Sequence, residues 1–207
     1  MIDILNDDCI ENSKTRRLEM LKKLVNFIYY ILRSQLYTQK EKIIKDGGKV
    51  GRNVFFGDDV IIDYDFAFLL EIEDGAVISS RTIIEMHDSS VPNARGYGEN
   101  KIGKVRICKR AYIGVNSVVL PGVTVGPGSI TGACSLINRD IPAGEVWGGV
   151  PASYICMVDD LIKRRKETSR PEIAYFDWIG EIEKCEVDYK IYREEFKKKV
   201  KAYFLQK

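Results

Sequence analysis

Residues 111–155 read AYIGVNSVVLPGVTVGPGSITGACSLINRDIPAGEVWGGVPASYI, and this stretch decides the fold. Within it an aliphatic residue or threonine recurs at every sixth position, namely at Ile113, Val119, Val125, Thr131 and Ile137. A period of six fits neither the 3.6-residue period of a helix nor the alternation of a hairpin strand. An internal repeat outweighs other signals in a fold assignment. The repeat therefore predicts a coil of short strands in which one apolar side chain per hexapeptide points inward.

The same stretch resembles the hexapeptide-repeat acyltransferases, of the maltose, galactoside and polysaccharide O-acetyltransferase type. The likeness lies in the consecutive hexapeptides and in the closing text Asp140-Ile141-Pro142 followed by Gly149-Val150-Pro151-Ala152. It covers residues 50–155. The resemblance implies a mostly β fold, the left-handed parallel β-helix. It also implies a homotrimer with active sites between neighbouring coils.

The 207-residue chain divides by pattern into three segments. Residues 1–49 form an N-terminal helical segment, 50–155 the β-helix and 156–207 a C-terminal helical extension. We expect one helix over residues 14–45, ended by Gly47-Gly48. A second amphipathic helix is expected near the C-terminus, where apolar residues recur every four positions at Tyr192, Phe196, Val200 and Phe204.

The first coils are less regular than the later ones. The positions Val50, Phe56, Ile62 and Phe68 lie six apart, and the register then slips by four before Ile72. Phe56 and Phe68 are therefore expected to point inward. Residues 88–104 are polar and rich in glycine, which predicts an extruded loop. A long loop in a compact fold is typical of a functional segment.

The apolar run at residues 24–33 is flanked by basic residues but is too short to span a bilayer, which needs about 20 residues. One interpretation is a peripheral helix at the inner face of a membrane. The other is a helix packed on the coil or on a neighbouring subunit.

Composition excludes several classes of function. The net charge is +2 and acidic residues interleave with the basic ones, so no nucleic-acid partner is expected. Five scattered cysteines without metal-type spacing, and an acidic start without an apolar leader, predict a cytoplasmic protein with reduced thiols. One histidine cannot supply the three that zinc takes in metal-dependent β-helix enzymes. No metal site is expected.

That histidine is His87, in the text Ile84-Glu85-Met86-His87-Asp88 at the end of a coil. The resemblance places the catalytic base of the family here, and an imidazole titrates near neutral pH. It implies direct transfer of acetyl from acetyl-coenzyme A (acetyl-CoA) to a hydroxyl or amine. A carboxylate should orient the ring. Glu85 and Asp88 are the candidates, with Glu85 preferred because it shares strand parity with His87.

The resemblance also suggests binding residues. Asp63-Tyr64-Asp65 stands where the family often has Asn-x-Asn against the acceptor, so Asp63 and Asp65 are candidate acceptor contacts. Arg95 and Tyr97, on the 88–104 loop, are further candidates. The donor candidates are Gly114, Asn116, Gly132, Arg139 and Trp147. Ser153 replaces a basic residue of the family, which puts one phosphate contact in doubt.

These observations predict an acetyl-CoA-dependent O-acetyltransferase. The acceptor would be a sugar or a cell-surface saccharide, so the role would lie in polysaccharide biosynthesis. Two alternatives stay open. One is acetylation of another acceptor, such as an antibiotic or an amino sugar. The other is a β-helix scaffold without catalysis, because a fold does not dictate function.

Overall fold

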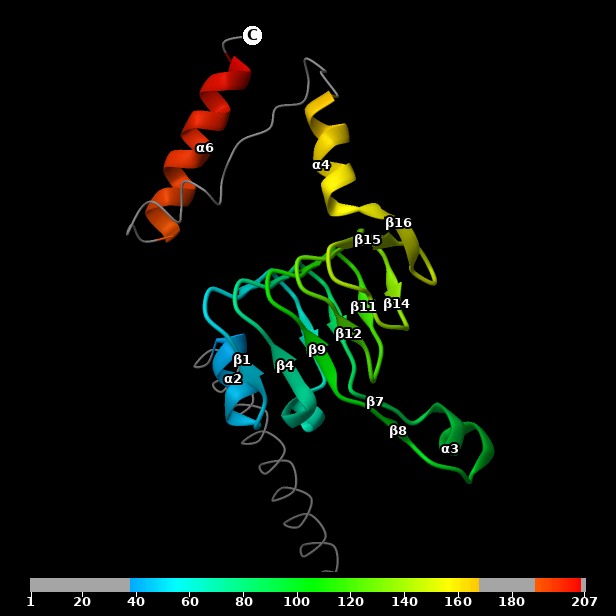
Figure 1. Cartoon of the computed structure of the whole chain (residues 1–207). Coiled ribbons are helices and arrows are strands. Elements are labelled where there is room, and N and C mark those ends of the chain that lie inside the picture. The colour runs from blue at the N-terminus through cyan, green and yellow to red at the C-terminus, as the bar shows by residue number, and fades with distance from the viewer. Residues whose placement is uncertain (1–37, 168–188, 206–207) are drawn as a thin grey trace, which may run out of the picture. The chain divides into compact units, whose positions relative to one another are not determined.

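The computed structural model describes residues 38–167 and 189–205 (Figure 1). Three sheets of short parallel strands form the sides of a coil, and successive strands belong to successive sheets. The first sheet contains β1 (Lys49–Val50), β4 (Leu70–Ile72), β9 (Val105–Ile107) and β12 (Thr124–Val125). The third contains β3 (Ile61–Ile62), β6 (Ile83–Ile84), β11 (Val118–Val119) and β14 (Leu136–Ile137).

The second sheet closes the coil at its C-terminal end. Its parallel strands are β2 (Phe55–Phe56), β5 (Val77–Ile78), β10 (Tyr112–Ile113), β13 (Ile130–Thr131) and β15 (Glu145–Gly148). Strand β16 (Ser153–Met157) then pairs antiparallel with β15 and ends the winding. Because each turn adds one strand to each side, the chain winds as a coil of parallel strands, as the repeat predicted. This arrangement is consistent with the parallel β-helix that the resemblance implied.

The core follows the period of six. The second residue of each two-residue strand in the three parallel sheets points inward, and in the central coils these side chains are fully buried, for example Ile78, Ile84, Ile113, Val119 and Ile137. Burying a side chain of this size contributes about 1.5–3 kcal/mol each. The inward hydroxyl of Thr131 accepts a hydrogen bond from the Gly114 amide at 3.0 Å, so this polar member of the repeat is satisfied.

Two expectations for the first coils are wrong. The helix α2 (Gln39–Lys45) begins at Thr38, which is extended and forms a capping box with Glu41, so no continuous helix runs to residue 45. Phe68 is 59% exposed rather than inward. After Ile62 the chain leaves the coil in a short 3-10 helix, η1 (Tyr64–Leu69), and the small Ala67 takes the fully buried position.

The segment expected to be a loop at 88–104 has a structure of its own. Strands β7 (His87–Asp88) and β8 (Lys101–Ile102) pair antiparallel, and the helix α3 (Ser90–Arg95) lies between them. We call residues 87–102 the arm, because they project from the coil (Figure 1). Every residue from Val91 to Ile102 except Pro92 is exposed in this chain.

The described residues fall into two compact units, one ending at Lys163 and one beginning at Arg164. The helix α4 (Val158–Glu167) carries the boundary, and α6 (Tyr189–Leu205) is the C-terminal helix expected from the apolar spacing. None of the described helices is long and apolar enough to cross a membrane. The apolar run 24–33 lies outside the described residues, so neither of its two interpretations is tested.

Candidate active site

One corner of the coil differs from the other two. Between the third and first sheets, later coils turn within a few residues, so that Arg106 in β9 pairs with Thr124 in β12. In the first two coils the same corner carries η1 and the arm. Residues that pair across the first sheet are therefore farther apart in the sequence there: Lys49 pairs with Glu71, and Glu71 pairs with Arg106. Two insertions in adjacent coils thus open on the same corner, and His87 lies where the second begins.

The His87 ring is held by a carboxylate of the preceding coil. Ile62 pairs with Ile84 across the third sheet, and the Asp63 amide donates to the Ile84 carbonyl at 3.1 Å. This register places Asp63 beside the ring, and its carboxylate accepts a hydrogen bond from Nδ1 of His87. The Asp63 side chain is 8% exposed and that of His87 is 35% exposed. With Nδ1 protonated, Nε2 keeps its lone pair and can act as a base.

The orienting carboxylate is therefore Asp63 rather than Glu85 or Asp88, and this corrects the expectation from strand parity. Asp88 has another partner, because its Oδ1 accepts from the Ser90 amide at 2.8 Å at the start of the arm. The hydrogen bond with the Ser90 side chain, and then that with its backbone amide, lower the pKa of Asp88. Pairing between coils, which brings Asp63 to the ring, outweighs proximity along the chain.

Carboxylates surround the His87 ring. The hydrogen bond with Asp63 raises the pKa of His87, although burial opposes it, and the charges of Asp63, Glu85 and Asp65 raise it further. Burial also raises the pKa of Glu85, and the neighbouring Asp63 adds to this effect. The site favours positive charge at the imidazole, which is what a general base acquires when it takes a proton.

An aromatic side chain covers one face of the His87 ring. Phe66, in η1, stacks on the His87 ring with centroids 4.7 Å apart and an interplanar angle of 29°. The sequence pattern gave no signal for this residue, because the period of six assigned Phe68 to the core and left Phe66 without a role. The ring of His87 is thus fixed by Asp63 at its edge and by Phe66 on its face.

Asp63, Glu85 and His87 also place one ligand atom each within 4.8 Å of one another. By spacing alone, this trio could hold a divalent cation. The hydrogen bond between His87 and Asp63 already uses two of the three groups, so the arrangement fits acid–base chemistry without an ion.

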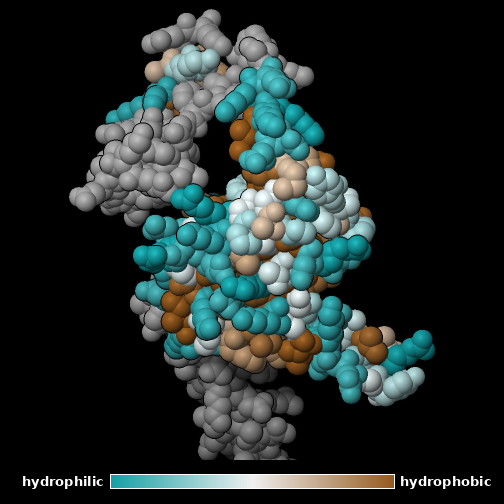
Figure 2. Space-filling model, in the orientation of Figure 1, coloured by the Kyte–Doolittle hydropathy of each residue, from teal (hydrophilic) through white to brown (hydrophobic). Residues whose placement is uncertain are grey.

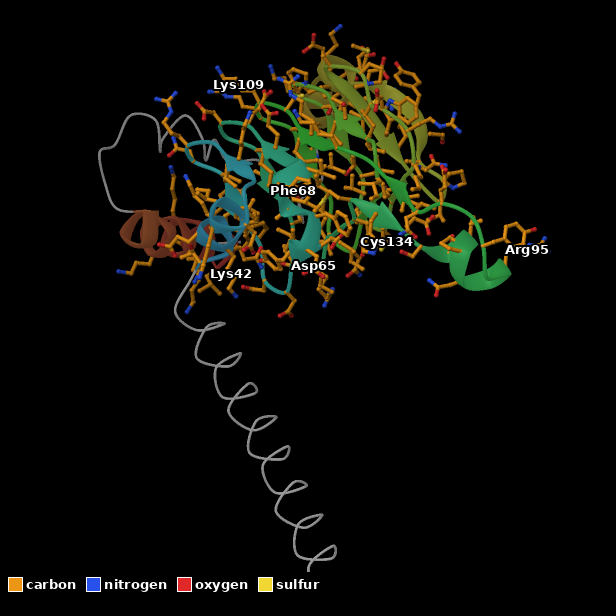
Figure 3. All side chains as sticks on the ribbon, turned by 90° about the horizontal axis from the view of Figure 1, so that it is seen from below. Lys42, Asp65, Phe68, Arg95, Lys109 and Cys134 are labelled. Atoms are coloured by element: carbon orange, nitrogen blue, oxygen red, sulfur yellow. The ribbon has the colours of Figure 1, made fainter. Side chains whose placement is uncertain are left out.

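The remaining acceptor candidates lie in different parts of the structure. Asp65 lies in η1 and is exposed. Its charge is close enough to His87 to raise the pKa of the imidazole. Arg95 and Tyr97 lie on the arm, and Figure 3 shows Arg95 at its far end, away from the coil. Within this chain the structure does not bring Arg95 or Tyr97 to His87.

The donor candidates lie in the later coils. A Cβ at Gly114 would come within 2.5 Å of the Gly132 backbone, so coil packing explains this glycine. A Cβ at Gly132 would meet nothing closer than 3.6 Å. Asn116 is exposed and accepts from Nε of Arg81 at 2.8 Å.

The other two donor candidates differ in exposure. Arg139 is exposed, and Ser153 at the start of β16 is exposed too. Trp147 packs on the core and donates to Glu145 at 2.6 Å, so packing accounts for it.

Comparison with known proteins agrees with this organisation. The family model described as "Bacterial transferase hexapeptide (six repeats)" matches residues 104–139. The protein named "Putative acetyltransferase YvoF", from Bacillus subtilis (strain 168), is 31% identical over 121 residues, which cover 58% of this chain and 67% of YvoF. The galactoside O-acetyltransferase of Escherichia coli (strain K12) is 30% identical over 115 residues, covering 55% of this chain and 56% of that enzyme.

Among solved structures, a maltose O-acetyltransferase from Clostridium difficile 630 aligns with a TM-score of 0.45 and 19% identity, over 67% of this chain and 88% of that one. The match to YvoF extends over two thirds of its length and includes residues beyond the repeat model. The chain belongs to the hexapeptide-repeat acetyltransferases.

Proposed function

We propose that this chain is an acetyl-CoA-dependent O-acetyltransferase that transfers acetyl to a hydroxyl of a sugar or cell-surface saccharide, with His87 as the general base. The observation that carries the proposal is the pairing of His87 with Asp63 at the corner where both insertions open. The names of the relatives support the acetyl group, and that of the galactoside enzyme supports a sugar acceptor. We also propose the left-handed coil of this family and a cytoplasmic role in polysaccharide biosynthesis.

The reaction follows from the tautomer of His87. Nδ1 donates to Asp63, so Nε2 accepts the proton of the acceptor hydroxyl as its oxygen bonds to the thioester carbonyl carbon. The carbonyl electrons move to oxygen and give a tetrahedral oxyanion. On collapse the C–S bond breaks, and the imidazolium returns the proton to the leaving thiolate. Asp63 stabilises the imidazolium between these steps, as a buried carboxylate does in other acyl transfers.

The acidic surroundings of the base support an amino sugar as a second candidate acceptor. Asp63, Asp65 and Glu85 would attract an ammonium group and repel an anion. Acetylation of an amine by the same base remains the alternative function, since the transfer differs only in the attacking atom.

Donor binding should depend on the later coils. We expect acetyl-CoA to raise the melting temperature, because a ligand at 100 times its dissociation constant stabilises the native state by about 2.7 kcal/mol. Thermal-shift titration with acetyl-CoA, free coenzyme A and a nucleotide measures this. Gly132→Ala has room for its methyl group, so it should keep the unliganded melting temperature and bind the donor more weakly.

Gly114→Ala is the contrasting variant. Its methyl group has no room, so it should lower stability without ligand by about 1–3 kcal/mol. If wild type shows no shift at millimolar donor, the donor assignment is wrong. An unchanged shift in Gly132→Ala would remove only the assignment of Gly132 to the donor site.

The outer faces of the coil support the homotrimer. The first sheet carries charge outward, with Lys104 paired to Glu71 at 2.6 Å and Arg106 paired to Glu73 (Figure 2). Each of the other two sheets turns a row of apolar side chains outward. The row on the second sheet is Phe55, Val77, Tyr112 and Ile130. The row on the third sheet is Ile61, Ile83, Val118 and Leu136. Two different apolar faces on one chain fit a closed ring, in which one face meets the other face of the next copy.

Ile61→Lys should therefore break the assembly without unfolding the coil, because Ile61 is 56% exposed in the single chain. The molar mass from light scattering should fall from that of a trimer to that of a monomer. Ile162→Lys makes the same change at a residue of α4 that is 45% exposed, and it should leave the mass unchanged. A wild-type monomer, or an Ile61→Lys trimer, would contradict the proposal.

A further inference from the structure

An exposed aromatic residue is separated from His87 by a single aromatic ring. Phe68 is 59% exposed, although most apolar side chains of the coil point inward. Its ring centroid lies 6.2 Å from that of Phe66, which in turn stacks on His87 at 4.7 Å. Aromatic side chains therefore lead from the base to the surface along η1. We call Phe66 and Phe68 the aromatic platform.

Buried residues beside the aromatic platform hold it in place. Ala67, between the two rings, is fully buried, and Leu70 directly after η1 is 1% exposed. A Cβ added at Gly47, just after α2, would lie 3.1 Å from Cβ of Phe68, so the backbone of α2's end supports this side chain. A rigid base with an exposed ring suits ligand binding, because little freedom is lost when a ligand contacts it.

Hydrogen-bonding groups border the platform. Asp65, in η1, is exposed, and Figure 3 labels it on the same segment as Phe68. Glu85 is half-buried beside His87, and its carboxyl group makes no hydrogen bond to any residue that the structure describes. An unpaired, partly desolvated carboxyl beside the base is suited to accept from, or donate to, a hydroxyl of a bound ligand.

The combination selects a ligand chemistry. A pyranose ring has one flat face of C–H groups and a rim of hydroxyls, so it matches an aromatic face bordered by carboxyl groups. An acyclic polyol offers the same hydroxyls without the flat face. A phosphate-bearing ligand would meet Asp63, Asp65 and Glu85 and be repelled.

We propose that the aromatic platform binds the apolar face of a saccharide ring and thereby presents one of its hydroxyls to His87. Phe68 is then a specificity-determining residue that distinguishes cyclic from open-chain acceptors. The inference rests on the proposed sugar acetylation and goes beyond it by naming the ring face as the recognised feature.

The test compares methyl β-galactoside with galactitol, which share most hydroxyls but differ in the ring. Saturation-transfer NMR, with irradiation of the protein's aromatic protons, reports contact with sugar protons without turnover. We expect transfer to one face of the galactoside ring in wild type and in His87→Ala, and its loss in Phe68→Ala. In acetylation assays Phe68→Ala should raise the galactoside KM about tenfold, the effect of roughly 1.4 kcal/mol, and leave that of acetyl-CoA unchanged.

Two further variants make the result specific. Phe68→Trp keeps an aromatic face and should retain the galactoside KM, whereas Phe68→Leu keeps an apolar side chain without a ring face and should behave like the alanine variant. Phe204→Ala makes the same change at a residue of α6 that is 42% exposed, and it should have no effect.

The outcomes separate this inference from the proposed function. If wild type acetylates the galactoside and Phe68→Ala does so with the same KM, the platform is wrong and the sugar acetyltransferase stands. If no saturation transfer to the galactoside occurs, the inference falls even when another acceptor is found. If Phe68→Ala instead changes the molar mass, the ring belongs to a subunit contact and the inference is also overturned.

Discussion

Replacing His87 with alanine should lower the rate of acetyl transfer by roughly 10²–10⁴, which is what a positioned general base supplies. An acceptor hydroxyl with a pKa far above 7 does not attack a thioester at a useful rate without such a base. His87 is the single histidine of the chain, so no second imidazole of the same chain can take over. Thiol release from acetyl-CoA in the presence of a sugar acceptor measures the rate.

The same variant should bind acetyl-CoA as wild type does, because the donor candidates lie in the later coils. An acetyl-CoA thermal shift equal to that of wild type would show that the fold and the donor site survive the substitution. Transfer at the wild-type rate in His87→Ala would contradict the assignment of the base. If His87→Ala loses both donor binding and acetyl transfer, His87 supports the structure instead of acting as the base.

Asp63→Asn should lower the transfer rate by about 10- to 100-fold, a part of the contribution that a positioned base makes. The amide has no negative charge to stabilise the imidazolium, and it can turn its NH₂ group toward the ring and favour the wrong tautomer. Asp88→Asn is the matched control. Its amide oxygen can still accept from the Ser90 amide, so the start of the arm is kept and the rate should stay close to wild type.

The comparison separates the two carboxylates that compete for the orienting role. A large loss in Asp88→Asn with little change in Asp63→Asn would reverse the assignment. Equal losses in both would place the defect in the geometry of the corner rather than in the charge beside the ring.

The sequence predicts the later coils well because their signal is local and repeated. Every position named from Ile113 to Ile137 lies on a strand and is buried, since each coil repeats the same backbone and only one face of each strand can point inward. The first coils depart from this pattern. Val50, Phe56 and Ile62 keep the period of six on strands β1, β2 and β3, whereas Phe68 continues it only by coincidence, because the backbone has left the coil after Ile62.

The position of His87 was also predictable, because it directly follows a strand of the repeat. Its partner is not predicted by the spacing along one strand, because Asp63 comes from the preceding coil. The signal was present in the register: Ile62 and Ile84 are both inward positions of the third sheet, which sets Asp63 next to Glu85 in space. The alternation of side chains along one strand predicts Glu85 as the partner of His87. The pairing of neighbouring strands across the third sheet instead brings Asp63 to the ring.

Phe66 had no signal in the pattern, because its position depends on the fold of a six-residue insertion. The polar and glycine-rich sequence of residues 88–104 predicts an extruded segment, but the hairpin pairing within the arm is a tertiary feature. Short polar segments carry weak periodicity, so pairing between β7 and β8 follows from their attachment to the coil at both ends.

The pH dependence of kcat/KM for acetyl transfer tests the central claim most directly, because it reports the ionisation of the base in the free enzyme. The hydrogen bond with Asp63 raises the pKa of His87 above its ordinary value of 6.5, so the neutral form gains population as pH rises through that elevated pKa. We expect kcat/KM in wild type to rise through a single ionisation above pH 6.5 and then level off. In Asp63→Asn the ionisation should move to lower pH and the plateau should fall. An ionisation that stays in place in Asp63→Asn, or a wild-type rate that does not change with pH, would contradict the His87–Asp63 pair as the base.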